Sequence, residues 1–106
     1  MTVLAPARPG GSATPATVVH VAGEIDIFTS HALRTRLLNA LPCRRGLLVV
    51  DVSAVSFCDA SGLGVLVGIQ HRARLRGVGL ALRGPRPQLV RLLRVTGLDR
   101  GIDVLA

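Results

Sequence analysis

Residues 46–76 read GLLVVDVSAVSFCDASGLGVLVGIQHRARLR, and this stretch determines what kind of fold the chain can have. Its first seven residues, 46–52, are almost all apolar or β-branched, which is typical of a strand buried on both faces. We expect turn residues at 53–59 and then a helix over about 61–76, because the first half of that segment is apolar nearly all round. A buried strand followed by a helix that covers it is the repeating unit of an α/β protein.

The chain upstream of this buried strand supplies one more strand and one more helix. Residues 16–22 (ATVVHVA) are a short β-branched run, so we expect a strand that ends at Gly23. Thr29 or Ser30 can cap the following helix, whose leucines recur every four residues until Pro42 ends it.

The chain downstream continues the alternation of strand and helix. Residues 79–82 and 102–105 read as strands, and between them Pro85 and Pro87 open a helix that Gly97 ends as a C-cap. This alternation predicts an α/β fold, with a mostly open sheet of four or five strands joined by crossover connections. Helices should cover at least one face of that sheet.

The length of 106 residues fits one domain. Residues 1–15 are rich in Ala, Pro, Gly, Ser and Thr, so we expect a flexible N-terminal arm there, with room for a short edge strand at residues 2–4. The folded domain is then expected to span residues 16–106.

The composition limits which classes of function are reasonable. All 13 basic residues are arginine, and the net charge is +7. Such a surface can attract nucleic acid, anionic lipid or an acidic protein. Single-stranded nucleic acid is disfavoured because only two aromatic residues are present to stack on bases. The helical arginines at 72, 74 and 76 also face different ways. We therefore interpret the arginines as a solvated surface, and expect no direct binding to nucleic acid or to a membrane.

The cysteines and the apolar runs bear on the compartment. Cys43 and Cys58 do not have the spacing of a metal site, and we expect both to be free structural thiols. No apolar run approaches the ~20 residues that a bilayer-spanning helix needs. The first ten residues lack the pattern of a signal peptide. These features predict a cytoplasmic protein.

Two short segments place polar groups where core periodicity predicts none. The first is residues 23–26 (GEID), directly after a strand, and the second is residues 57–64 (FCDASGLG), at a loop-to-helix junction. Both should lie at the edge of the sheet where strands lead into helices. In open α/β sheets this edge is where binding sites form.

Ser61 is the residue of greatest interest in the second segment. It is expected at or near the N-cap of its helix, where backbone N–H groups lack partners and the helix dipole favours a phosphoryl group. Gly62 and Gly64 have no side chains, so another molecule could approach closely. Asp59 can accept backbone N–H groups, or the hydroxyl proton during phosphoryl transfer. Taken alone, the pattern also fits an ordinary helix cap.

The order and spacing of four segments resemble the STAS family. They are residues 23–26 (GEID), 48–53 (LVVDVS), 57–66 (FCDASGLGVL) and 90–98 (VRLLRVTGL), within a match over about residues 16–106. Within the family, the chain is most similar to the bacterial anti-sigma-factor antagonists. The resemblance implies a STAS-like α/β fold: a small mixed sheet of four to five strands, one of them antiparallel, with helices packed mainly on one side.

The same resemblance implies a function and a site. Ser61 would be phosphorylated by an anti-sigma factor with a histidine-kinase-like ATPase fold, and a serine phosphatase would reverse the modification. The unphosphorylated protein would bind that anti-sigma factor and release a sigma factor. The surface that faces the partner and its nucleotide would comprise Asp26, Asp59, Gly62, Leu63 and Gly64. Many relatives have a second hydroxyl residue where this chain has Ala60, so Ser61 is the single candidate phosphosite.

Two other interpretations stay open. The first keeps the STAS fold and makes the chain an interaction module of a stress-signalling or transport-associated complex. The second is enzymatic, with Ser61 as a nucleophile or Asp26 and Asp59 as an acid–base pair. A serine nucleophile needs a base, and no histidine accompanies Ser61 in a familiar triad signature. We therefore expect a kinase substrate and not an enzyme, and assign no catalytic residue, metal site or cofactor.

Overall fold

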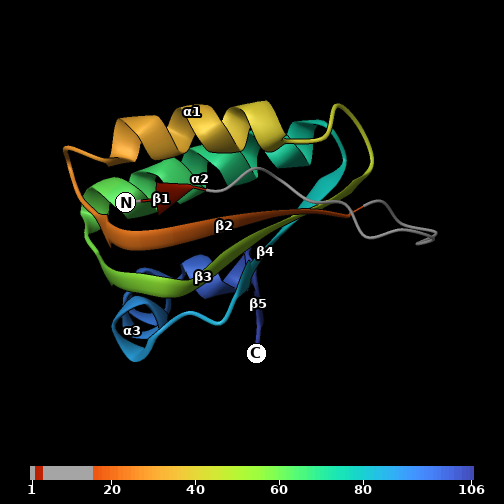
Figure 1. Ribbon diagram of the computed structural model, residues 1–106. Helices are drawn as coiled ribbons and strands as arrows, with labels where there is room; N and C mark the ends of the chain where they lie inside the picture. The colour runs from red at the N-terminus through yellow and green to blue at the C-terminus, as the bar shows by residue number, and fades with distance from the viewer. Residues whose placement is uncertain (1, 4–15) are drawn as a thin grey trace.

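The computed structural model of the chain describes residues 2–3 and 16–106 (Figure 1). The elements in chain order are β1 (Thr2–Val3), β2 (Ala16–Ile25), α1 (Ser30–Ala40), β3 (Gly46–Cys58), α2 (Ala60–Leu75), β4 (Val78–Arg83), α3 (Pro87–Thr96), a 3-10 turn (Leu98–Arg100) and β5 (Asp103–Leu105). The expected edge strand is present as β1. The remainder of the expected N-terminal arm lies outside the described residues, and the division at residue 16 stays a prediction.

The five strands form one mixed sheet in the order β1-β2-β3-β4-β5. β1 pairs antiparallel with β2, and each later strand pairs parallel with the one before it. Parallel neighbours need crossover connections, which α1, α2 and α3 supply. The predicted α/β class and the single antiparallel strand are both confirmed.

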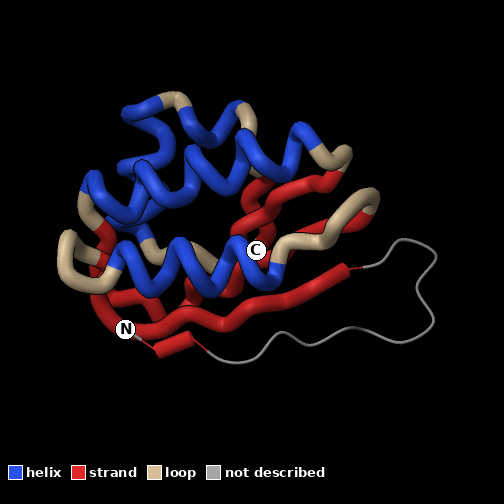
Figure 2. The backbone as a smooth tube through the Cα atoms, turned by 90° about the horizontal axis from the view of Figure 1, so that it is seen from above, coloured by secondary structure: helices blue, strands red, loops and turns tan. Residues whose placement is uncertain are grey.

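Two helices lie side by side on the sheet. Figures 1 and 2 show α1 and α2 running next to each other, with both helices starting at the same end of the molecule. Their inward leucines pack with the alternate residues of β3 into one core, which also takes in the buried leucines of α3. The largest fully buried side chains include Leu33, Leu37, Leu48, Ile69, Leu82 and Leu93.

The strand β3 is longer than its sequence pattern predicts. The interpretation of residues 53–59 as a turn was wrong, because β3 runs on to Cys58. Its extension pairs with the end of β2, as in the pair Ile25 and Cys58, so β2 also continues past Gly23. The register shifts at two irregularities, each of which adds one residue to β3. Bulges of this kind break the strict alternation on which pattern reading depends.

The helix ends follow local chemistry. α1 starts after Thr29 and stops before Pro42, and Pro87 is the first residue of α3. Gly97 takes a left-handed conformation with φ of 77°, and its N–H donates to the Arg94 carbonyl at 3.2 Å. Only glycine adopts this conformation without a steric penalty, so the predicted C-cap is confirmed.

Candidate functional site

The ends of β2 and β3 bring the two polar segments together. The Asp59 N–H donates to the Ile25 carbonyl at 3.1 Å, directly across the ends of the two strands. The loop that contains Asp26 and the start of α2 that contains Ser61 therefore lie at one end of the molecule, as Figure 1 shows. These residues meet where β2 and β3 end and lead into helices, as the sequence analysis expected.

The carboxylate of Asp59 caps α2. Its Oδ1 accepts the Ser61 N–H at 2.9 Å and also accepts the Ser61 hydroxyl. Asp59 is thus the N-cap and Ser61 the second residue of the helix, in agreement with the expectation that Ser61 lies at or near the N-cap. Asp59 suits the N-cap position because its side-chain carboxylate can accept the backbone N–H two residues ahead. Ser61 is partly buried.

The hydrogen bonds set the protonation state of Asp59. The Ser61 hydroxyl, together with the backbone N–H groups of Ser61 and Gly62, lowers the pKa of the Asp59 carboxyl against the opposing effect of desolvation. Asp59 is therefore an anion at neutral pH and accepts the hydrogen bond from the Ser61 hydroxyl. Next to it, burial and then the Asp59 charge raise the pKa of Cys58 to about 11. Cys58 is fully buried and protonated, as expected of a structural thiol, and both cysteines are free.

The three residues after Ser61 differ in exposure. Gly62 is buried, and a Cβ there would lie 2.5 Å from Cys58 Sγ and 2.7 Å from Ile25 Cγ2. Leu63 is 7% exposed and belongs to the core. Gly64 is exposed, and a Cβ there would have no atom within 4 Å. Of the three, only Gly64 presents surface to an incoming molecule.

The carboxylate of Asp26 shapes the loop from β2 to α1. Its Oδ1 accepts the N–H groups of Phe28 at 2.9 Å and Thr29 at 3.1 Å. The Thr29 hydroxyl accepts the Asp26 N–H at 3.0 Å and donates to the Glu24 carbonyl at 3.1 Å. This compact turn leaves the side chains of Ile27 and Phe28 69% and 85% exposed. Asp26 therefore positions two apolar side chains at the surface.

A hollow of about 340 Å³ separates the starts of α1 and α2. Its lining residues are Ser30, His31, Arg34, Ser61, Gly64 and Val65, and we call it the α1–α2 hollow. Ser61 thus faces a polar and basic wall from α1, which the sequence analysis missed. The sequence shows that residues 30 and 34 share one helix face, but not that this face lies beside Ser61. His31 also lines the hollow. The Ser61 hydroxyl donates its hydrogen bond to Asp59, so His31 does not accept it as a catalytic base would.

Gln88 of α3 is a second residue that the sequence analysis missed. Its Oε1 accepts the Cys58 N–H at 3.1 Å, and its Nε2 donates to the Cys58 carbonyl at 2.8 Å. The paired residues of β4 end at Arg83, opposite Asp51, so β4 does not reach this part of β3. The Gln88 amide stands in for the missing strand and fixes the backbone directly before Asp59. No local pattern around residue 88 signals this role.

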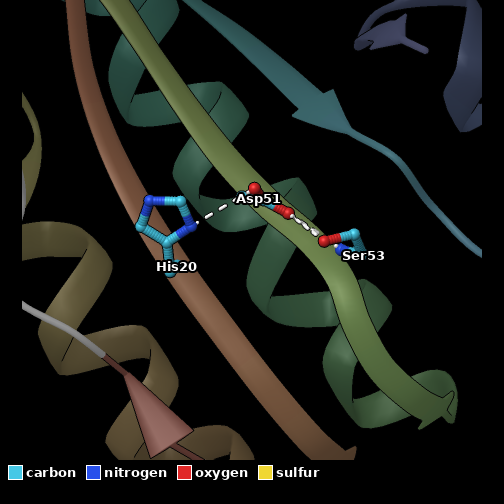
Figure 3. A network of polar contacts seen from close by, with 3 residues as sticks. All are labelled: His20, Asp51 and Ser53. Carbon is cyan, nitrogen blue, oxygen red and sulfur yellow. Dashed lines mark hydrogen bonds and ion pairs between the residues drawn. The ribbon is translucent and has the colours of Figure 1, made fainter.

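A separate polar network lies on the face of the sheet opposite α2. Figure 3 shows His20 from β2 beside Asp51 and Ser53 from β3, with α2 behind the strands. Asp51 Oδ2 lies 3.2 Å from His20 Nδ1, and Asp51 Oδ1 accepts the Ser53 hydroxyl at 2.7 Å. The aspartate stands between the histidine and the serine, so the imidazole does not activate the hydroxyl as in a catalytic triad.

Desolvation acts to raise the pKa of Asp51, but hydrogen bonds from Ser53 and the charges of His20 and Arg83 outweigh it and lower the pKa.

Within residues 2–3 and 16–106, no group of three or more His, Cys, Asp or Glu side chains is arranged to hold a metal ion. No helix in the described part of the chain is both long and apolar enough to cross a membrane.

Comparison with known proteins gives consistent matches. A family model described as Mlab, STAS domain, matches residues 11–106. The anti-sigma-B factor antagonist of Bacillus subtilis (strain 168) is 36% identical over 88 residues, which cover 83% of this chain and 80% of that protein. The anti-sigma-B factor antagonist of Listeria monocytogenes serovar 1/2a is 36% identical over 87 residues, which cover 81% of this chain and 75% of that one. A crystal structure of an anti-sigma factor antagonist from Mycobacterium paratuberculosis has a TM-score of 0.74 at 28% identity, covering 98% of this chain and 86% of the other.

Proposed function

The chain belongs to the STAS domain family, and from this premise we propose that it is an anti-sigma-factor antagonist that is switched off by phosphorylation of Ser61. The observation that carries the proposal is the position of the Ser61 hydroxyl. It lies on the second residue of α2, lines the α1–α2 hollow and is hydrogen-bonded to an ionised carboxylate. Relatives that carry the name of anti-sigma factor antagonist support the choice of partner.

The unphosphorylated surface suits a protein partner. Gly64 leaves backbone bare beside Ser61, so another chain can approach closely. On the neighbouring loop, Ile27 and Phe28 expose apolar side chains that bury well in an interface. The partner in this proposal is an anti-sigma factor with a histidine-kinase-like ATPase fold. Its capture would release a sigma factor, and the exchange would take place in the cytoplasm.

The same partner would modify Ser61 with a nucleoside triphosphate that it holds. The Ser61 oxygen would attack the γ-phosphorus and form a new P–O bond. The bond between the γ-phosphorus and the bridging oxygen would break, and the nucleoside diphosphate would leave. The hydroxyl proton would pass to Asp59, which already accepts the hydrogen bond from this hydroxyl. A serine phosphatase would restore the hydroxyl by hydrolysis.

The phosphoryl group changes the surface in two ways. It adds a charge of about −1.5 to −2. It also removes the O–H that donates to Asp59, so two anionic groups then stand two residues apart. Both must be desolvated when a partner covers the start of α2. Like charges in an interface cost several kcal/mol, so a loss of affinity of about a hundredfold or more is expected.

The test is a pull-down from lysate of the native host, with wild-type, Ser61→Ala and Ser61→Asp proteins as baits. We expect wild-type and Ser61→Ala to recover an anti-sigma factor with an ATPase fold, and Ser61→Asp to lose it. Ser53→Asp is the matched control, since Ser53 also donates its hydroxyl to an aspartate two residues earlier but lies on the sheet. It should retain the partner. Equal recovery by the Ser61→Ala and Ser61→Asp baits would refute the switch.

A further inference from the structure

The α1–α2 hollow is lined by one face of α1 and one face of α2, with three residues from each helix. Ser30, His31 and Arg34 lie on one face of α1, and Ser61, Gly64 and Val65 lie on one face of α2. Positions one turn apart on each helix thus face each other across the gap. The basic side chains come from α1, and the hydroxyl proposed as the phosphosite comes from α2.

Arg34 is placed where small residues of α2 leave room for it. Its Nη2 lies 3.8 Å from the position that a Cβ on Gly68 would occupy. A Cβ on Gly64, one turn nearer to Ser61, would meet nothing within 4 Å. The guanidinium therefore lies over Gly68, about two helical turns beyond Ser61, and Gly64 places no side chain between them.

Arg34 has no carboxylate partner in the described part of the chain. The six acidic residues all fall within residues 16–106, and the one ion-pair contact found there joins His20 to Asp51. Asp59 is directed to the N–H and hydroxyl of Ser61. An exposed arginine beside a phosphosite, without an anion of its own, has the chemistry to receive a phosphate.

We propose that Arg34 is the counter-charge that holds the phosphoryl group of phosphorylated Ser61 in the α1–α2 hollow. Guanidinium N–H groups match phosphate oxygens in a bidentate arrangement, and the positive end of the α2 dipole adds to the attraction. Arg34 would then be a positioning residue for the switched-off form. The inference rests on the proposed function, because it needs Ser61 to be phosphorylated.

The experiment installs phosphoserine at position 61 during synthesis, so that no kinase is required. The second pKa of the phosphate is then measured by ³¹P NMR titration in the wild-type background and in Arg34→Gln. A nearby cation favours the dianion, so Arg34→Gln should raise this pKa by about half a unit. Arg34→Lys keeps the charge without the planar fork and should give an intermediate value.

Arg36→Gln is the matched control. It removes the same charge from the exposed side of the same helix, but residue 36 does not line the hollow. It should leave the phosphate pKa close to the wild-type value. An equal pKa in Arg34→Gln and Arg36→Gln would overturn the proposal. The titration needs no partner protein, so its failure beside a successful pull-down would reject only the role of Arg34. Failure of the pull-down beside a shifted titration would reject only the anti-sigma function.

Discussion

The chain contains the pattern Asp-x-Ser twice, and the two copies make the same pair of hydrogen bonds. Asp51 accepts the N–H of Ser53 at 3.0 Å and its hydroxyl. Asp59 accepts the N–H of Ser61 at 2.9 Å and its hydroxyl. Each aspartate uses a single oxygen, Oδ1, for both bonds. Local hydrogen bonding therefore does not distinguish the two serines.

The surroundings do distinguish them. The first pair lies within β3, next to a bulge, on the face of the sheet opposite α2. The second stands at the start of a helix, above a buried glycine and beside the α1–α2 hollow. The switch proposed for Ser61 needs a hydroxyl that a partner can reach and backbone dipoles that respond to charge, and of the two serines only Ser61 stands at a helix start. The following predictions test how the second setting is maintained.

The largest expected effect on stability comes from the glycine below Ser61. Gly62→Ala would press a methyl group against Cys58 and Ile25, and we expect the free energy of unfolding to fall by about 2–3 kcal/mol. Gly64→Ala meets open space and gains helix propensity, so it should be neutral or stabilising by up to about 1 kcal/mol. Urea unfolding of both variants measures this. Equal stability of the two would contradict the packing described for Gly62.

A smaller effect on stability is expected from Gln88, whose side chain takes the place of a neighbouring strand beside Cys58 and Asp59. Gln88→Ala leaves the N–H and C=O of Cys58 without their partner, and should cost about 1–2 kcal/mol in urea unfolding. Gln70→Ala is the control, because Gln70 makes a single exposed bond to the Gly101 carbonyl. Its cost should be clearly smaller. If Gln70→Ala were as destabilising as Gln88→Ala, the two hydrogen bonds from Gln88 to the Cys58 backbone would not contribute more than the single exposed bond of Gln70.

The smallest effect concerns the two carboxylates themselves. Both Asp51 and Asp59 have lowered pKa values in the folded protein. Each therefore contributes stability that is present above the unfolded pKa of about 3.9 and is lost as the pH falls through the lower folded value.

Urea unfolding across the acid range measures this contribution. The wild-type protein should lose stability as the pH drops below about 4, and Asp51→Asn and Asp59→Asn should each make that loss shallower. The double variant should be shallower still. If neither substitution changed how the free energy of unfolding falls at low pH, these hydrogen bonds would not favour the ionised carboxylates.

Much of the architecture follows from short-range patterns. The stop at Pro42, the proline at the first position of α3 and the glycine cap at Gly97 all agree with the sequence analysis. Each depends on residues within about one helical turn, where the backbone and side-chain preferences act directly. The apolar runs of β3 and α2 likewise identified buried elements correctly.

Other parts of the site could not be predicted because they depend on partners far away in the sequence. Residues 53–59 look like a turn in isolation, yet residues 53–58 extend β3 because the end of β2 lies beside them. Gly62 and Leu63 follow Ser61 directly, yet packing turns them toward the core.

The sequence by itself determined the order of strands and helices along the chain, the stop of α1 before Pro42 and the C-cap at Gly97, since each depends on neighbours a few residues apart. The tertiary structure alone decided that Gln88 clamps Cys58 and that Arg34 and Ser61 line the same hollow. These residues lie about 30 positions apart in the chain, and their contact depends on sheet register and on how α1 packs beside α2. Such contacts are set by the global packing of the core, to which a local pattern carries no signal.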